Sequence, residues 1–144
     1  MVLGLEQRLL RWELWYHEKF IDRALDYKRS NRYDDVYPDH IYDRIPDRWH
    51  LSLLGTDEKF QRRGIGRMLL EFGMRMAERD DVPIALESSV AGMSLYKRSG
   101  FKVVYKAEVE GDLECVVMAW EPEQSMGEWV EDLGNGEWQV REQS

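Results

Sequence analysis

The stretch FQRRGIGRML, residues 60–69, decides the fold because it places three arginines and two glycines between a short apolar run and a long amphipathic one. A loop that leads into a helix N-terminus exposes unpaired N–H groups at the positive end of the helix dipole, so it binds anions. Gly64 and Gly66 let a ligand approach the backbone closely. The positive charge around that ligand would come from Arg62, Arg63 and Arg67. The pattern suits a diphosphate, although in isolation solvated loop charges and a glycine turn explain it equally well.

The composition limits the class of protein. A chain of 144 residues with 43% hydrophobic residues fits one domain with a substantial core. The formal net charge of −8 argues against nonspecific binding to nucleic acid or to an anionic membrane surface. Cys115 is the only cysteine, which excludes an intramolecular disulfide, and no apolar stretch of about 20 residues is present. Because no secretory signal is evident either, we expect a cytoplasmic protein without nucleic-acid or membrane partners.

Regular elements surround the motif in an alternating order. An apolar run over 49–54 predicts a strand, and the apolar spacing over 65–79 predicts a helix. The apolar side of that helix is formed by Ile65, Met68, Leu69, Phe72 and Met76. The run IALE over 84–87 predicts a second strand, and a short helix over 91–99 is expected to end at Gly100. This order of elements indicates an α/β protein.

A hairpin is expected after these elements. The β-branched and aromatic runs over 101–109 and 114–120 flank Gly111 and Asp112, a pair that supports a tight turn. An antiparallel hairpin that follows a parallel unit makes the predicted sheet a mixed one.

The two ends of the chain differ from this core. Apolar residues at steps of three and four predict an N-terminal helix over about 5–28, and residues 30–48 are interrupted by prolines and predict an irregular connection. Residues 121–144 are expected to form an acidic tail that is partly docked through Trp129 and Trp138. Residues 1–120 are then expected to form a single domain.

Two motifs, QRRGIG over 61–66 and LYKRSGF over 95–101, stand in register along the chain. They resemble the Q/R-x-x-G-x-G/A and L-Y-x-x-x-G-F motifs of the GNAT superfamily of acyl-CoA N-acyltransferases, especially its fungal-type members. The resemblance spans roughly Trp49 to Trp120, and two motifs at this distance are far more specific than one. It implies a GNAT-like mixed sheet flanked by helices, in which the family's N-terminal strands are missing or replaced by a helix.

The resemblance implies acetyl-CoA as the acyl donor and assigns residues to it. In the family, the strand before the loop splays from its neighbour, and its free backbone groups pair with the pantetheine arm. The matching positions here are Leu54, Gly55 and Thr56. The family's pyrophosphate contacts come from amides of the loop, which Gln61 opens here. The matching amides belong to Arg62, Arg63, Gly64, Ile65, Gly66 and Arg67.

The resemblance also implies groups that move protons. Tyr96 occupies the position from which the family commonly protonates the leaving thiolate, and a phenol with a pKa of about 10 can donate that proton. His50 lies on the strand that flanks the acyl group, where some members use a histidine as the general base. Packing of Tyr96 against the cofactor and a structural or solvated His50 remain open as alternatives. Glu87 and Ser88 are weaker candidates for the base.

Other polar residues are less informative. His17 and His40 lie outside the matched region, and the spacing of the histidines and the cysteine predicts no zinc site. Ser89 stands where many relatives have an asparagine, seven residues before the tyrosine, which leaves the contacts near the CoA thiol open.

The expected function is transfer of an acetyl group from acetyl-CoA to the amine of a small molecule, by direct transfer. One alternative is a repurposed protein of secondary metabolism that acts as a cofactor-independent cyclase or isomerase. Another is a degenerate, non-catalytic binding module. An exposed sheet edge would also allow a homodimer.

Overall fold

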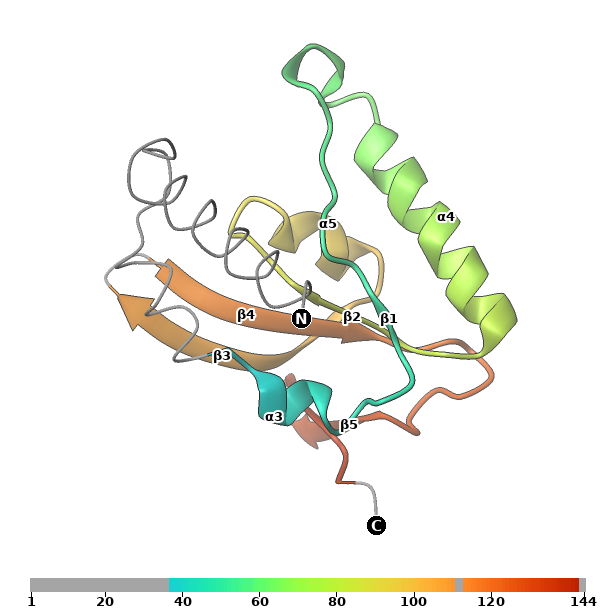
Figure 1. The fold of residues 1–144 in the computed structure, drawn as a ribbon, viewed down its shortest axis with the longest axis vertical. Helices are drawn as coiled ribbons and strands as arrows, with labels where there is room; N and C mark the ends of the chain where they lie inside the picture. The colour runs from blue at the N-terminus through green and yellow to red at the C-terminus, as the bar shows by residue number, and fades with distance from the viewer. Residues whose placement is uncertain (1–36, 111–112, 143–144) are drawn as a thin grey trace, which may run out of the picture. The chain divides into compact units, whose positions relative to one another are not determined.

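The computed structural model describes residues 37–110 and 113–142, all of which belong to one compact unit (Figure 1). The helix expected over 5–28 lies outside the described residues, as do Gly111 and Asp112 of the expected turn. In the part of the chain that is described, no helix is both long enough and apolar enough to cross a membrane.

The main sheet has four strands in the order β1-β2-β4-β3. They are β1 (Trp49–His50), β2 (Ile84–Glu87), β3 (Lys102–Glu110) and β4 (Leu113–Trp120). The first two are parallel, whereas β4 is antiparallel to both of its neighbours. The sheet is therefore mixed, and the second strand and the hairpin were predicted correctly.

The first strand is shorter than the apolar run predicts. Strand β1 ends at His50, and the last bond to its neighbour runs from Leu51 N to Ala85 O at 3.0 Å. Strand β2 continues to Glu87, because its other edge stays paired with β4. Figure 1 shows the chain after β1 leaving the sheet. The prediction over 49–54 was too long because apolar character gives strand propensity without providing a partner strand.

Two helices follow the loop and pack on one face of the sheet. They are α4 (Ile65–Asp80) and α5 (Met93–Arg98), close to the predicted ranges. Leu70 of α4 and Tyr96 of α5 share one buried cluster with Leu86 of β2. Since side chains alternate along a strand, the neighbours of Leu86 in β2 face the opposite side.

Helix α5 ends as the sequence predicts. Gly100 has φ +93°, in the left-handed region that favours glycine. The Gly100 N–H donates to Lys97 O at 3.2 Å, and the Phe101 N–H donates to Tyr96 O at 3.1 Å. This pair of bonds is a Schellman motif, which satisfies the carbonyls of the last turn.

The apolar side predicted for α4 is not the side that faces the core. Leu70 and Ala77 are buried, whereas Met68, Leu69 and Phe72 are 66%, 49% and 58% exposed. Helix α4 carries apolar residues on two sides, so periodicity alone assigned the wrong one.

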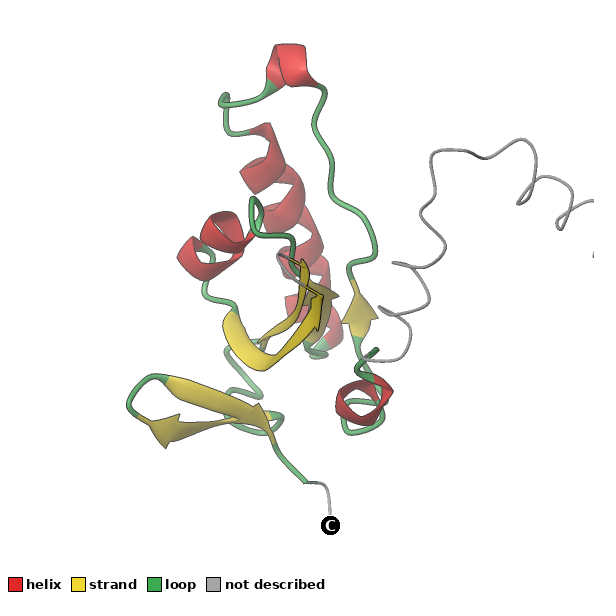
Figure 2. Cartoon of the chain, turned by 90° about the vertical axis from the view of Figure 1, so that its left-hand side faces the viewer, coloured by secondary structure: helices red, strands yellow, loops and turns green. Residues whose placement is uncertain are grey.

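The expected acidic tail contains a second hairpin. Strands β5 (Val130–Gly134) and β6 (Glu137–Val140) pair antiparallel as a separate two-stranded sheet (Figure 2). Glu121 accepts hydrogen bonds from the backbone N–H groups of Gly127, Trp129 and Val130, which fixes the approach to β5. The two strands were missed because they are short and largely polar, and their anchor is a carboxylate rather than an apolar pattern.

Trp138, one of the two indoles expected to dock the tail, contacts the main sheet. The Nζ atom of Lys102 on β3 lies 4.5 Å from the centroid of the Trp138 ring, a cation–π contact. The Nε1 atom of Trp129, the other indole, is buried, and it has no hydrogen-bond partner among the described residues.

Candidate functional site

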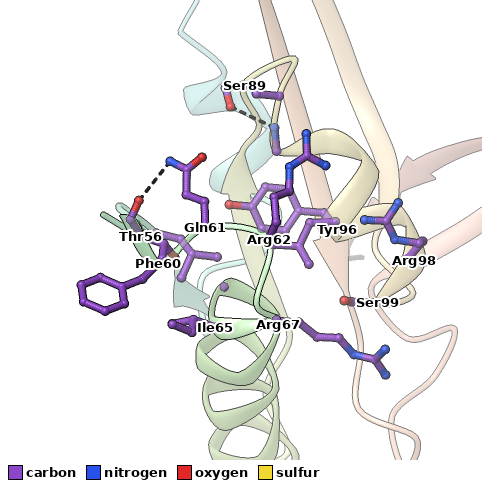
Figure 3. A pocket seen from close by; sticks show the side chains of 16 residues that line it. Thr56, Phe60, Gln61, Arg62, Ile65, Arg67, Ser89, Tyr96, Arg98 and Ser99 are labelled. Carbon is purple, nitrogen blue, oxygen red and sulfur yellow. Dashed lines mark hydrogen bonds between the residues drawn. The ribbon is translucent and has the colours of Figure 1, made fainter. Parts of the chain in front are cut away.

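A pocket of about 560 Å³ opens where the N-terminus of α4, helix α5 and the segment after β1 meet (Figure 3). Nine residues that the sequence predicted for the site line it: Leu54, Thr56, Gln61, Arg62, Gly64, Ile65, Gly66, Arg67 and Tyr96. Gly55, Arg63 and His50 do not line it. The structure therefore brings most of the two motifs together around one cavity.

The loop before α4 is built from local hydrogen bonds. A short 3-10 helix, η2 (Glu58–Phe60), begins at Asp57, whose carboxylate accepts the Lys59 N–H at 2.9 Å. The Gln61 side chain donates to Thr56 O at 3.2 Å, which ties the end of the loop to its beginning. These bonds fix the shape of the loop over 56–61, which precedes the pocket-lining residues at the start of α4.

Two residues of the loop adopt the left-handed conformation. Arg62 has φ +61° and Gly64 has φ +80°. Such residues turn successive N–H groups toward a common concave side, a main-chain arrangement that binds anions. The first bond of α4 is donated by Met68 N to Gly64 O at 3.0 Å, so the N–H groups of Ile65, Gly66 and Arg67 have no carbonyl within the helix.

The arginines contribute unequally to the charge of the pocket. Arg62 lines it, whereas Arg67 also pairs with Glu71 through Nε at 2.7 Å. The guanidinium of Arg63 lies 5.6 Å from the centroid of the Phe60 ring instead. Arg98 of α5 lines the pocket and was not predicted. Main-chain N–H groups and at least two arginines therefore surround a space that fits a diphosphate.

The segment between β1 and η2 offers a free strand edge. Leu51 makes the last bond to β2, and no hydrogen bond joins residues 52–55 to a strand within the described chain. Leu53 is 88% exposed, while Leu54 and Thr56 face the pocket. An unpaired edge with its N–H and C=O groups exposed can bind an extended amide chain as an added strand.

Tyr96 is held in the wall of the pocket by α5. The residue is 8% exposed, and burial raises the pKa of its phenol above the ordinary value of 10. A phenol with the ordinary pKa of about 10 is already protonated at neutral pH, and burial shifts the pKa of Tyr96 further in this direction. Its ring lies close to Gly92, where an added Cβ would approach Tyr96 Cε2 to 2.9 Å.

Seven pocket residues were not among the predicted site residues, although Ser89 was noted for its position before the tyrosine motif. They are Phe60, Ser89, Ala91, Gly92, Leu95, Arg98 and Ser99. Gly92 and Ser99 stand four residues before and three after Tyr96, so helical spacing over 91–99 could have placed them on its face. Ser89 accepts the Gly92 N–H at its carbonyl (3.0 Å) and at its hydroxyl (3.2 Å), which shapes the start of α5.

His50 lies outside this pocket. It pairs with Ala85 across the parallel strands, and its Nε2 atom is 3.3 Å from Oε2 of Glu87. Its ring also packs against Tyr42 of helix α3 (Asp39–Tyr42), with 5.2 Å between ring centroids. The two weaker candidates for the base, Glu87 and Ser88, have different surroundings. Glu87 contacts His50, whereas the buried Ser88 donates its hydroxyl to Ser89 O.

Of the other two histidines, His40 does not line the pocket. His40 packs edge-on against Tyr105, with ring centroids 5.1 Å apart, and His17 lies outside the described residues. Among residues 37–110 and 113–142, no three His, Cys, Asp or Glu side chains are grouped so that they could hold a metal ion.

Comparisons with known proteins found chains that are similar over part of their length. Over 65 residues the chain is 40% identical to a probable acyltransferase, SID5, of Ajellomyces capsulatus. The aligned segment covers 42% of this chain and 46% of that protein. The chain thus matches about half the length of this relative. A solved structure, the ribosomal-protein-S18-alanine N-acetyltransferase of Escherichia coli, is similar with a TM-score of 0.41 and 28% identity. That match covers 50% of this chain and 54% of the bacterial one.

A family comparison extends over most of the described residues. The family of the acetyltransferase (GNAT) domain matches residues 35–122, which include the pocket, both motifs and the four strands of the main sheet. This match covers more than half of the chain. The chain belongs to the GNAT acetyltransferase family.

Proposed function

We propose that the chain transfers an acetyl group from acetyl-CoA to the amine of a small molecule by direct transfer. The observation that carries this proposal is the pocket, in which unpaired amides at the start of α4 and an unpaired strand edge meet at a buried tyrosine. These three features would suit the diphosphate, the pantetheine arm and the thioester of one cofactor. Family membership supports acyl transfer in general.

The cofactor would bind along the pocket in an extended form. Its diphosphate would accept hydrogen bonds from the amides of Ile65, Gly66 and Arg67, with Arg62 and Arg98 adding charge. The amides of the pantetheine arm would pair with the backbone near Leu54, which mimics a missing strand. The thioester would then lie near Tyr96.

The reaction needs three proton transfers. The acceptor ammonium must first become a neutral amine, and His50 is the proposed base that removes its proton. The amine nitrogen then attacks the thioester carbonyl, the C–N bond forms and the C–S bond breaks, while the nitrogen releases its second proton to solvent. Tyr96, whose phenol is protonated at neutral pH, gives its proton to the leaving thiolate. The spent groups exchange protons with solvent, so the enzyme returns to its starting state.

The two proton-carrying groups lie on opposite faces of the sheet. Tyr96 belongs to the cluster that contains Leu86, while His50 shares the other face with Ala85. Strand β1 separates from β2 just after Leu51, so a substrate bound at this point could contact groups on both faces of the sheet. We propose that the acceptor approaches from the His50 face and the cofactor from the Tyr96 face. An acidic chain favours acceptors of positive charge.

The test combines calorimetry with acetyl-CoA and CoA with a thiol-release assay over a panel of small amines. Cofactor binding together with amine-dependent thiol release is the expected result. Binding without release on any amine would instead support a non-catalytic binding module. Absence of binding, together with product formation in a cofactor-free assay, would support a repurposed enzyme.

A further inference from the structure

A second group of polar side chains lies on the opposite face of the sheet from the pocket. Strand β2 ends at Glu87, two residues after Ala85, and His50 is the partner of Ala85 across the parallel pair. Side chains two residues apart on a strand point to the same face. Glu87 and His50 therefore extend from neighbouring strands to one side, at the point where these strands separate.

Both oxygens of the Glu87 carboxylate are engaged. The Tyr42 hydroxyl donates to Oε1, and Nε2 of His50 lies 3.3 Å from Oε2. The Tyr37 hydroxyl also forms a hydrogen bond with this carboxylate. The side chains of His50 and Glu87 are 28% and 21% exposed, so the pair is shielded but still reachable from solvent.

These contacts decide between two candidate bases. The oxygens of Glu87 already contact the Tyr42 hydroxyl and Nε2 of His50, which leaves the imidazole rather than the carboxylate to receive a further proton donor. For Nε2 of His50 to donate to Glu87, the proton of the neutral imidazole must sit on Nε2. The lone pair then sits on Nδ1, which leaves that nitrogen as the basic one.

The groups that hold Glu87 come from a separate element. Tyr42 is the last residue of α3, and burial and the Glu87 carboxylate both raise the pKa of its phenol. The Tyr42 phenol therefore stays protonated, and able to donate its hydrogen bond, throughout the neutral pH range. Arg48 donates to Tyr42 O at 2.9 Å and to Ile45 O at 2.6 Å, and its guanidinium lies 4.5 Å from the centroid of the Tyr42 ring.

We propose that Glu87 is the positioning residue for His50, with Tyr42 fixing the carboxylate from α3. Glu87 holds the imidazole with its proton on Nε2 and faces the positive charge that forms when Nδ1 takes the proton of the acceptor amine. The inference rests on the proposed acyl transfer for its chemical role. The expected position of the His50 proton on Nε2, and its dependence on Glu87, do not depend on the proposed acyl transfer.

Kinetics of three variants test the role in catalysis. Glu87→Gln keeps the shape but removes the charge, so kcat is expected to fall roughly 10- to 100-fold while the affinity for CoA stays unchanged. Glu87→Asp keeps the charge and is expected to retain more of the wild-type kcat than Glu87→Gln does. Glu114→Gln on β4 makes the same charge change away from the site and is expected to change nothing.

Nitrogen NMR of the imidazoles tests the geometry without turnover. Signals of His50 are identified by comparison with His50→Gln. The wild-type protein is expected to carry the neutral proton on Nε2, and Glu87→Gln is expected to lose this preference. A proton on Nδ1, or an unchanged tautomer in Glu87→Gln, would overturn the proposal even in a protein that acetylates no amine. Unchanged kinetics of Glu87→Gln in an active enzyme would overturn the role in catalysis and leave the proposed function intact.

Discussion

At the scale of single residues, Gly92 leaves the space that the Tyr96 ring occupies. A Cβ at this glycine would come within 2.9 Å of Tyr96 Cε2 and 3.3 Å of Ser89 Oγ, so the tyrosine ring would have to move. We expect Gly92→Ala to lower kcat by roughly 10-fold or more, because small displacements of a reacting group are costly. Steady-state kinetics with calorimetry of CoA binding measure this effect.

The control for this substitution is Gly73→Ala in α4. A Cβ at Gly73 meets nothing within 4 Å, and the residue does not line the pocket. Alanine in a helix interior is expected to stabilise the chain by about 0.5–1 kcal/mol, with unchanged activity. Equal kinetics of Gly92→Ala and the wild type would show that the contact with Tyr96 does not matter.

Tyr96 itself is tested by Tyr96→Phe. The substitution removes the hydroxyl and keeps the ring, so kcat should fall by roughly 10²-fold or more with little change in CoA affinity. Because burial raises the pKa of Tyr96 above 10, activity that depends on its proton should persist in the wild type to above pH 10. An unaltered kcat in Tyr96→Phe would assign the residue to packing alone.

Residues of the pocket differ in how far the sequence could reveal them. The loop over 61–67 is local, so its residue types and spacing were enough to place it. Gly92 and Ser99 could have been found from their helical spacing to Tyr96. The contact between Tyr42 and Glu87 joins residues 45 apart in the chain, so no local pattern could have revealed it.

At the scale of elements, the β5–β6 hairpin depends on the Glu121 carboxylate. This side chain accepts three backbone N–H groups, from Gly127, Trp129 and Val130. Glu121→Gln leaves one of the two oxygens as an acceptor and removes the charge, so we expect it to cost about 1–3 kcal/mol of unfolding free energy. Urea unfolding followed by circular dichroism gives this quantity.

Glu128→Gln is the matched control, since Glu128 is exposed and the charge change is the same. It is expected to stay within about 0.5 kcal/mol of the wild type. A Glu121→Gln protein as stable as this control would mean that the hairpin is held by other contacts, such as that of Trp138 with Lys102.

Elements were predictable to the extent that their signals are local. The ranges of β2, α4 and the end of α5 follow from apolar spacing and from Gly100. The early end of β1 could not be predicted, because it depends on pairing with β2 rather than on its own residues. The prediction of which side of α4 faces the core was wrong for a related reason. Two sides of the helix carry apolar residues, and only packing against the sheet selects between them.

At the scale of the whole molecule, buried phenols make stability depend on pH. The pKa values of Tyr42 and Tyr96 are raised in the folded state, chiefly by burial and, for Tyr42, also by Glu87. Above about pH 10 the unfolded chain loses these protons while the folded chain keeps them. The stabilisation is therefore fully present below about pH 10 and is lost as pH rises from there through the folded-state pKa values.

Urea unfolding of the wild type and Tyr42→Phe between pH 9 and a value above 11 tests this expectation. The free energy of unfolding should fall with pH in the wild type and fall less steeply in Tyr42→Phe. A parallel decline in both proteins would show that Tyr42 does not account for the loss.

The central claim is that main-chain amides at the start of α4 receive the diphosphate of CoA. Gly64 has φ +80° and open space around its missing Cβ, so Gly64→Val disturbs the backbone and the approach of a ligand rather than the packing. Gly127→Val is matched, with φ +87° and equally open space, and lies outside the pocket.

Calorimetric titration of CoA into the wild type and these two variants is the most direct measurement. We expect binding by the wild type, at least roughly 10-fold weaker binding by Gly64→Val, and unaltered affinity in Gly127→Val. No heat of binding at millimolar CoA in a folded wild-type protein, or equal affinity in Gly64→Val, would contradict the claim.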